Sequence, residues 1–131
     1  MSNYSFERVT PGTTIKVKGL PVEGHDRMYI TVNSDYKIPL LTPVPCEIFA
    51  RYDSPDHFEL INVITRLASM SLREGVPLEI IARELKDIHS PKTFHIIPGT
   101  STNCPSITAR IGEALENYLN QKNKNEQEQA A

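Results

Sequence analysis

The first half of the chain alternates apolar and polar residues with a period of two. In "TTIKVKGL" the apolar Ile15 and Val17 alternate with Lys16 and Lys18, and the runs "RMYITVN" and "CEIFARY" repeat the pattern. Turn-forming segments such as "NSDYKIP" and "TPVP" separate these runs, as is typical of β-strands joined by short connections. We therefore predict an antiparallel meander of about three strands, with one face against the core and the other solvated or covered by a partner.

The period changes from two to about 3.6 residues after Asp53. Ser54 and Pro55 are typical of a helix start, apolar residues then recur at helical spacing, and Gly75 provides a stop. The helix predicted over 54–71 has a wider apolar surface than one sheet can cover. It is either a central core helix or a helix that also packs across a subunit interface, and the width of the apolar surface leads us to expect a homo-oligomer.

Two further helices are predicted in the second half of the chain. One begins at Pro77, and the last begins at Pro105 and carries its apolar face as far as Leu119. The short apolar run "TFHII" between them is a strand or a buried extended segment. Residues 121–131 contain no apolar anchor, so we expect a disordered polar tail there.

These elements predict a two-layer α+β fold, in which a β-meander precedes about three helices and the helices mediate oligomerisation. A chain of 131 residues is long enough to bury a real core and too short for two independent cores. We therefore expect a single domain at residues 1–120.

Composition and charge exclude several classes of protein. With 14 basic and 16 acidic residues, the chain has no cationic field for duplex DNA, although a few arginines can still hold a small anion. No apolar run approaches the roughly 20 residues of a membrane span. Cys46 and Cys104 are the only cysteines and the N-terminus has no signal-peptide pattern, so we expect free thiols and a cytoplasmic location. The four histidines are scattered and indicate no metal site.

The polar loop "PGTSTNCPS" precedes the last helix and offers hydrogen-bond donors at the N-terminus of that helix. The open N–H groups and the macrodipole at such an end attract anions. Thr102, Asn103 and Ser106 add polar side chains around the opening. Arg110 lies one turn beyond Ser106, from where its guanidinium can reach back. These groups suit a phosphate; the alternative is that the loop only caps the helix and that Arg110 is a surface residue.

The sequence shows no set of neighbouring residues that would form a catalytic site. No carboxylate or histidine is close in sequence to Cys104, and the adjacent His25 and Asp26 have no nucleophile beside them. The chain also contains no glycine-rich phosphate loop of the Walker or dinucleotide-binding type. We therefore expect a protein that is not an enzyme and that carries no cofactor.

The order of motifs resembles the small TSCPD-type module found near the C-terminus of cobalamin-dependent ribonucleotide reductases. The likeness spans residues 11–119 and includes "PCEIFARYDSPDHFELINVITRLASMSLREG" and "NCPSITARIGEALENYL". The radical-site machinery of a reductase barrel is absent from the chain. A free-standing copy is therefore expected to do something other than reduce ribonucleotides.

The chain is also similar to the phage Thoeris anti-defence proteins of the first type, here called the sponge family, in its length and in placing a β-sheet before α-helices. This resemblance implies a non-catalytic phage protein in the host cytoplasm, which sequesters cyclic ADP-ribose isomers that the host makes as an immune signal. It also implies assembly as dimers or hexamers and a second site for cyclic di- or trinucleotides.

The resemblance to the sponge family further implies a set of ligand-binding residues. Arg27 in "GHDRMY" and Arg110 in the last helix match two arginines for a diphosphate, and Phe94 and Asn103 match aromatic and polar groups before that helix. Phe94 is either a stacking platform for adenine or a plain core residue. A second function also remains open, that of an accessory or regulatory TSCPD-type subunit that docks onto a ribonucleotide reductase.

Overall fold

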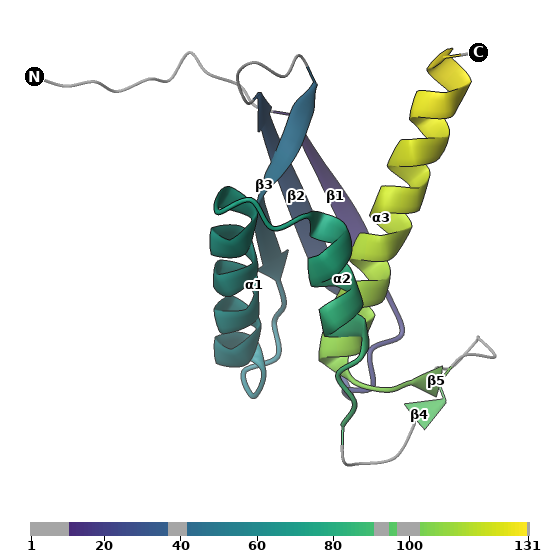
Figure 1. The fold of residues 1–131 in the computed structure, drawn as a ribbon. Coiled ribbons are helices and arrows are strands. Elements are labelled where there is room, and N and C mark those ends of the chain that lie inside the picture. Colours follow the sequence, from purple (N-terminus) through teal and green to yellow (C-terminus); the bar gives the residue numbers. More distant parts are fainter. Residues whose placement is uncertain (1–10, 37–41, 91–94, 97–102, 131) are drawn as a thin grey trace, which may run out of the picture.

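The described part of the chain consists of three antiparallel strands followed by three helices, with a short two-stranded ribbon before the last helix. The computed structural model describes residues 11–36, 42–90, 95–96 and 103–130 (Figure 1). The elements are β1 (Gly12–Val17), β2 (Met28–Tyr36), β3 (Pro43–Arg51), α1 (Phe58–Arg73), α2 (Leu78–Lys86), β4 (His95–Ile96), β5 (Asn103–Cys104) and α3 (Ile107–Ala130). The predicted α+β fold, with a meander ahead of the helices, is confirmed.

Alternation along the meander sends its apolar side chains to one face of the sheet. The strands are neighbours in the order β1-β2-β3, with both pairs antiparallel. Met28, Ile30 and Val32 of β2 are fully buried, whereas Tyr29 of β2 and Phe49 of β3 are exposed on the opposite face. Burial of one alternate set and exposure of the other is what the period of two predicts.

Strands β2 and β3 run further than their composition predicts. The sequence predicts turns that include "NSDY" and "PVP". In the structure these residues lie inside β2 and β3. The two prolines are tolerated because β3 is an edge strand that pairs on one side only. A shift of register after Asn33 also makes Cys46 the extra residue of a β-bulge, which bends β3 locally.

Helix α1 lies along the outer edge of β3, where a strand would otherwise leave its backbone groups open (Figure 1). The buried Ser69 hydroxyl accepts a hydrogen bond from the N–H of Ile48 at 2.9 Å. Its own proton faces the carbonyl oxygens of Ile48 and Thr65, at 2.9 and 2.8 Å. The Ser69 side chain therefore hydrogen-bonds to both the N–H and the C=O that Ile48 presents at the edge of β3, and it anchors α1 to the sheet.

The start of α1 differs from the prediction, and its end agrees with it. The helix begins at Phe58 rather than at Ser54, because residues 54–57 form a turn. In this turn the His57 N–H donates to the Ser54 carbonyl at 3.2 Å, and the Ser54 hydroxyl lies 2.8 Å from Nδ1 of His57. Gly75 follows the helix with φ of 97°, a left-handed conformation that favours glycine.

Helices α2 and α3 pack with a close approach of their backbones. A Cβ atom added to Gly112 would lie 2.5 Å from the amide nitrogen of Lys86 and 2.7 Å from the carbonyl oxygen of Ala82, so the crossing requires glycine. The Lys86 ammonium also pairs with the Glu116 carboxylate at 2.9 Å across the same two helices. The hydrogen bond to Glu116 raises the pKa of Lys86 above its ordinary value.

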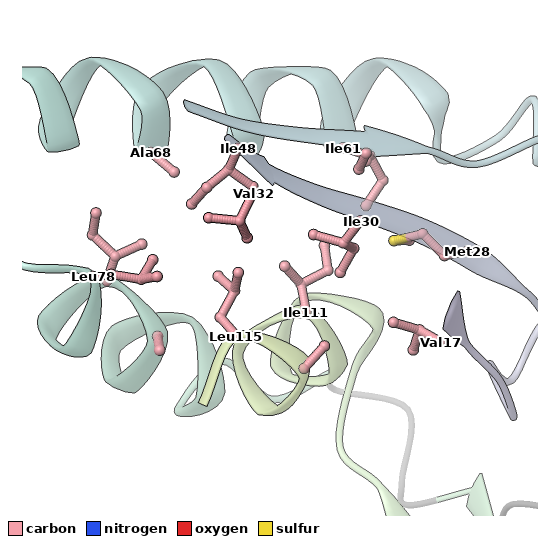
Figure 2. Close-up of a cluster of buried hydrophobic side chains, with 14 of the residues drawn as sticks. Val17, Met28, Ile30, Val32, Ile48, Ile61, Ala68, Leu78, Ile111 and Leu115 are labelled. Carbon is pink, nitrogen blue, oxygen red and sulfur yellow. The ribbon is translucent and has the colours of Figure 1, made fainter. Parts of the chain in front are cut away.

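One buried cluster joins the sheet to all three helices. Figure 2 shows Ile30 and Val32 of β2 pointing toward Ile111 and Leu115 of α3, with Leu78 of α2 beside them. Buried residues of α1 belong to the same cluster. Helices α2 and α3 therefore cover the apolar face of the meander, α1 closes the core along the edge of β3, and the opposite face carries the exposed Tyr29 and Phe49.

Helix α3 continues past Leu119, where the sequence predicts its apolar face to end. Residues 121–130 are helical in the structure, in place of the expected disordered tail. This stretch contains no glycine or proline and is rich in glutamine, lysine and glutamate, which favour helix. None of the helices in the described ranges is both long and apolar enough to cross a membrane.

We expect Ser69→Ala to lower the free energy of unfolding by about 1–3 kcal/mol, because the N–H and C=O of Ile48 would stay buried without their partner. Urea unfolding followed by circular dichroism measures this change. Ser71→Ala is the matched control, since the Ser71 hydroxyl donates only to the Leu67 carbonyl of its own helix, at 2.8 Å. The control should change the free energy by less than about 0.5 kcal/mol. Equal effects of the two substitutions would contradict the anchoring role of Ser69.

Candidate functional site

Several connections of the chain meet at one end of the molecule, around the start of α3. The β1–β2 loop, the turn before α1, the end of α2 and the ribbon of β4 and β5 all lie at this end, at the bottom of Figure 1. The arrangement follows from the antiparallel order of strands and helices, because every second connection returns to the same end. Residues far apart in the sequence therefore become neighbours here.

A cleft of about 540 Å³ opens at this end between four segments of the chain. Its walls are residues 21–23 of the β1–β2 loop, His57 and Leu60 at the start of α1, residues 88–90 after α2, and residues 105–108 at the start of α3. The volume lies in the range of small-molecule sites, roughly 300–1,000 Å³. The cleft therefore lies where the sequence predicts anion binding, at the mouth of the last helix.

Ser106 caps α3 and ties it to the segment after α2. Its hydroxyl accepts a hydrogen bond from the Ala109 N–H at 2.9 Å and donates to the Ile88 carbonyl. This predicted ligand donor is thus engaged within the protein. Among the described residues, the N–H groups of Ile107 and Thr108 have no acceptor, and both residues line the cleft. The mouth of α3 therefore offers backbone donors rather than the Ser106 hydroxyl.

Arg110 joins α3 to the β1–β2 loop and is not one of the residues that line the cleft. One guanidinium nitrogen lies 2.7 Å from the Glu113 carboxylate, and another donates to the Lys18 carbonyl at 3.2 Å. Its Nε is buried and has no acceptor among the described residues. The sequence predicts a guanidinium that reaches back to the helix mouth, whereas in the structure its charge is already paired.

Arg27 lies at the same end of the sheet as the loop that Arg110 holds. Val17 pairs with Met28, so the next residues of the two strands, Lys18 and Arg27, leave the sheet together. The Arg27 side chain is 59% exposed, and the carboxylate of the preceding residue lies 4.0 Å from its Nε. The structure therefore brings both predicted arginines to one end of the sheet, with Arg27 the more available of the two.

The other predicted site residues are less fully placed. Phe94 and Thr102 lie outside the described residues. Asn103 lies in β5, whose backbone pairs with β4. Their roles toward a ligand stay predictions.

Two histidines line the cleft, although the sequence does not single them out. His57 and His89 come from the turn before α1 and the segment after α2. His25 of the β1–β2 loop forms a hydrogen bond with Asp53 at 2.8 Å, at the same end of the fold. No local sequence pattern predicts that these histidines lie at one end of the fold, because their positions depend on the tertiary structure. Within the described residues, no group of His, Cys, Asp and Glu is arranged to hold a metal ion.

Arg110→Ala is expected to lower the free energy of unfolding by about 1 kcal/mol, because it removes a hydrogen bond to the Lys18 carbonyl and an ion pair with Glu113. Urea titration of the two proteins measures the difference. The control is Arg83→Ala, which removes an exposed arginine of α2 and should stay within about 0.5 kcal/mol of the parent. If both variants unfold at the same urea concentration as the parent, Arg110 does not stabilise the attachment of α3.

Comparison with known proteins gives one family. The model of the TSCPD domain matches residues 4–119 of the chain. No curated protein and no solved structure matches it. The TSCPD relationship that the motifs indicate is therefore confirmed, and the relationship to the sponge family stays a proposal.

Proposed function

The chain belongs to the TSCPD domain family, a module associated with ribonucleotide reductases, and from this premise we propose that it binds a nucleotide without transforming it. The proposed ligand is a cyclic ADP-ribose-type signal of host immunity, with cyclic di- or trinucleotides as further ligands. A phage protein that sequesters this signal in the host cytoplasm would block a Thoeris-like defence.

The observation that supports this proposal is the cleft at the mouth of α3. The open N–H groups of Ile107 and Thr108, together with the positive end of the helix macrodipole, suit phosphate oxygens. The imidazoles of His57 and His89 add further hydrogen-bonding groups, and the Glu23 carboxylate suits a ribose hydroxyl rather than a phosphate. This mixture of groups fits a phosphorylated sugar better than a bare anion.

The two arginines take different parts in this proposal. Arg27 does not line the cleft either, but it is exposed at the end of the β1–β2 loop, whose residues 21–23 form one wall of the cleft, so its guanidinium is available for a diphosphate. The charge of Arg110 is already balanced by Glu113, and its second contact holds the Lys18 carbonyl of the same loop. We therefore assign direct contact with the ligand to Arg27, and support of the β1–β2 loop to Arg110.

One serine–histidine contact among the described residues has the spacing of a catalytic pair but not its exposure. Ser54 lies 2.8 Å from His57, as a nucleophile and its base would. Ser54 is only 1% exposed, however, and the neighbouring Asp53 binds His25 rather than orienting His57. A buried hydroxyl cannot attack a ligand in the cleft, so we propose that the pair shapes the turn before α1.

Retention of intact ligand tests the proposed function. The protein is incubated with cyclic ADP-ribose isomers or with cyclic di- and trinucleotides, freed of unbound ligand, and heated, and the supernatant is analysed by mass spectrometry. We expect intact ligand only after denaturation. Hydrolysed ligand would show an enzyme instead. No retention, combined with capture of a ribonucleotide reductase chain, would favour the accessory subunit over the binding protein.

Arg27→Ala is expected to weaken binding of the retained nucleotide about tenfold to a hundredfold, the loss of a charge-assisted hydrogen bond worth roughly 1.5–3 kcal/mol. Unfolding should be unchanged, because the side chain is exposed. Arg27→Lys should recover only part of the affinity, since an ammonium lacks the planar pair of donors. Calorimetric titration measures all three proteins, with Arg83→Ala as the control for loss of one positive charge. Parental affinity in Arg27→Ala would remove Arg27 from the site.

A further inference from the structure

The face of the sheet that is turned away from α2 and α3 carries aromatic and cationic side chains in register. Strand pairing places Lys16, Tyr29 and Arg51 side by side in one row across β1, β2 and β3. Tyr29 is 41% exposed, and the two cations are exposed as well. The alternation that buries Met28 and Ile30 therefore sets an aromatic ring between two positive charges on the opposite face.

The next row holds a second aromatic ring and two hydroxyl groups. Thr14, Thr31 and Phe49 are partners across the three strands, and Phe49 is 58% exposed. The hydroxyls of Thr14 and Thr31 lie 3.0 Å apart and hydrogen-bond to each other. We call these two rows the sheet platform, which consists of Thr14, Lys16, Tyr29, Thr31, Phe49 and Arg51.

The spacing of the two rings suits the bases of a single strand. Tyr29 lies opposite Arg51 and Phe49 lies opposite Thr31, so the two aromatic residues are diagonal neighbours on adjacent strands. Diagonal neighbours on one face are about 7–8 Å apart, which allows each ring to take one of two successive bases of an extended strand. Proteins that bind unpaired bases stack them on exposed aromatic side chains of open antiparallel sheets in this way. A duplex keeps the faces of its bases inside the helix and does not offer them to such rings.

Both cations of the first row are available to phosphate groups. Within the described ranges, Lys16 and Arg51 take part in none of the ion pairs. The chain as a whole carries 14 basic and 16 acidic residues, so this local excess of positive charge is not a product of the overall charge. Two phosphate contacts are too few to hold a duplex by charge alone, whereas in a single strand base stacking adds to them.

Carboxylates border the platform and limit the path of a bound strand. Glu47 lies in the third row, where it accepts a hydrogen bond from Asn33 at 2.7 Å. At the opposite end Asp53 is bound to His25 at 2.8 Å, and Asp26 lies 4.0 Å from the guanidinium of the following residue. Negative charge at these positions repels phosphate, so the phosphates are expected over the two cations of the first row.

The pair of threonines favours RNA over DNA. One of the two hydroxyls donates to the other, so the pair keeps one proton and several lone pairs for another molecule. Thr31 lies opposite Phe49 and two residues from Tyr29 on the same face, so a ribose attached to a stacked base is close to these groups. A ribose 2′-hydroxyl is both a donor and an acceptor, which complements them.

We propose that the sheet platform binds single-stranded RNA. Bases stack on Tyr29 and Phe49, and a ribose 2′-hydroxyl meets the threonine pair. The phosphates contact Lys16 and Arg51. None of the platform residues lines the cleft at the start of α3, so this inference does not rest on the proposed binding of a cyclic nucleotide.

Titration of a fluorescein-labelled uridine decamer, followed by anisotropy, tests the platform directly. Tyr29→Ala and Phe49→Ala should each weaken binding about tenfold, the loss of one stacked base. Tyr36→Ala is the matched control, because Tyr36 is 55% exposed on β2 but alternates to the other face of the sheet; it should bind as tightly as the parent. Parental affinity in Tyr29→Ala and Phe49→Ala overturns the proposal. No binding by the parent also overturns it and leaves this face to a protein partner.

Leucine variants separate stacking from folding. Tyr29→Leu and Phe49→Leu keep an apolar side chain on the strand but remove the π face. Their melting curves should match that of the parent, while the loss of RNA affinity persists. Parental affinity in both variants overturns the stacking of bases on the platform.

The dependence of binding on salt measures the phosphate contacts. For a single strand, the logarithm of the binding constant falls with the logarithm of the salt concentration by about 0.7 per phosphate contacted. Lys16→Gln and Arg51→Gln should each make this slope shallower by about that amount. Arg83→Gln, which removes an exposed arginine of α2, should leave the slope unchanged. An unchanged slope in the first two variants overturns the assigned phosphate contacts.

Two competitors identify the ligand and its place. A deoxyuridine decamer differs from the RNA only in its 2′-hydroxyls, so it should bind more weakly, and equal affinity overturns the choice of RNA. Cyclic ADP-ribose, in excess, should leave the RNA bound whether or not it enters the cleft. Displacement of the RNA would place it in the cleft and overturn the platform.

Discussion

The hydrogen bonds between the Ser69 hydroxyl and the Ile48 peptide decide how the rest of the molecule is arranged. A three-stranded meander has open edges, and a buried edge group without a partner costs about 1–3 kcal/mol. Ser69 engages both groups of Ile48 from α1, so the helix cannot rotate about its axis without losing them. This orientation turns Ile61 toward the core and leaves Leu67 facing outward. It also places the start of α1, with His57, at the wall of the cleft.

Much of the fold could be predicted from the sequence, because its periods are set by burial. The alternation in β2 places Ile30 and its neighbours in the core as the pattern requires. The strand and helix boundaries that the sequence misplaces have causes that the pattern of apolar and polar residues does not contain. Pro43 and Pro45 stay in β3 because that strand pairs on one side only, which is a property of the sheet. Ser54 bonds to the ring of His57 and so starts a turn where its residue type predicts a helix cap.

Less of the candidate site could be predicted, because its residues meet only through the tertiary structure. The mouth of α3 is correctly placed, since proline and small polar residues mark a helix start within a few positions. The partners of the side chains are not local, however. Arg110 binds the Lys18 carbonyl, which lies in a distant loop. His57 and His89 enter one cleft because their segments end on the same side of the fold. A sequence taken one segment at a time contains no signal for such encounters.

The distribution of polar and apolar residues around α1 is the reverse of that expected for a helix that packs only against the core of its own chain. Its inward face carries Thr65 and Ser69, whose hydroxyls are satisfied by backbone groups, and its outward face carries large apolar residues. The inward polarity is explained by the edge of β3. The outward apolar residues add little to the folding of one chain, since lysine or glutamate would serve there equally well. They suit a helix that also packs across a subunit interface, which is one of the two alternatives that the sequence leaves open for this helix.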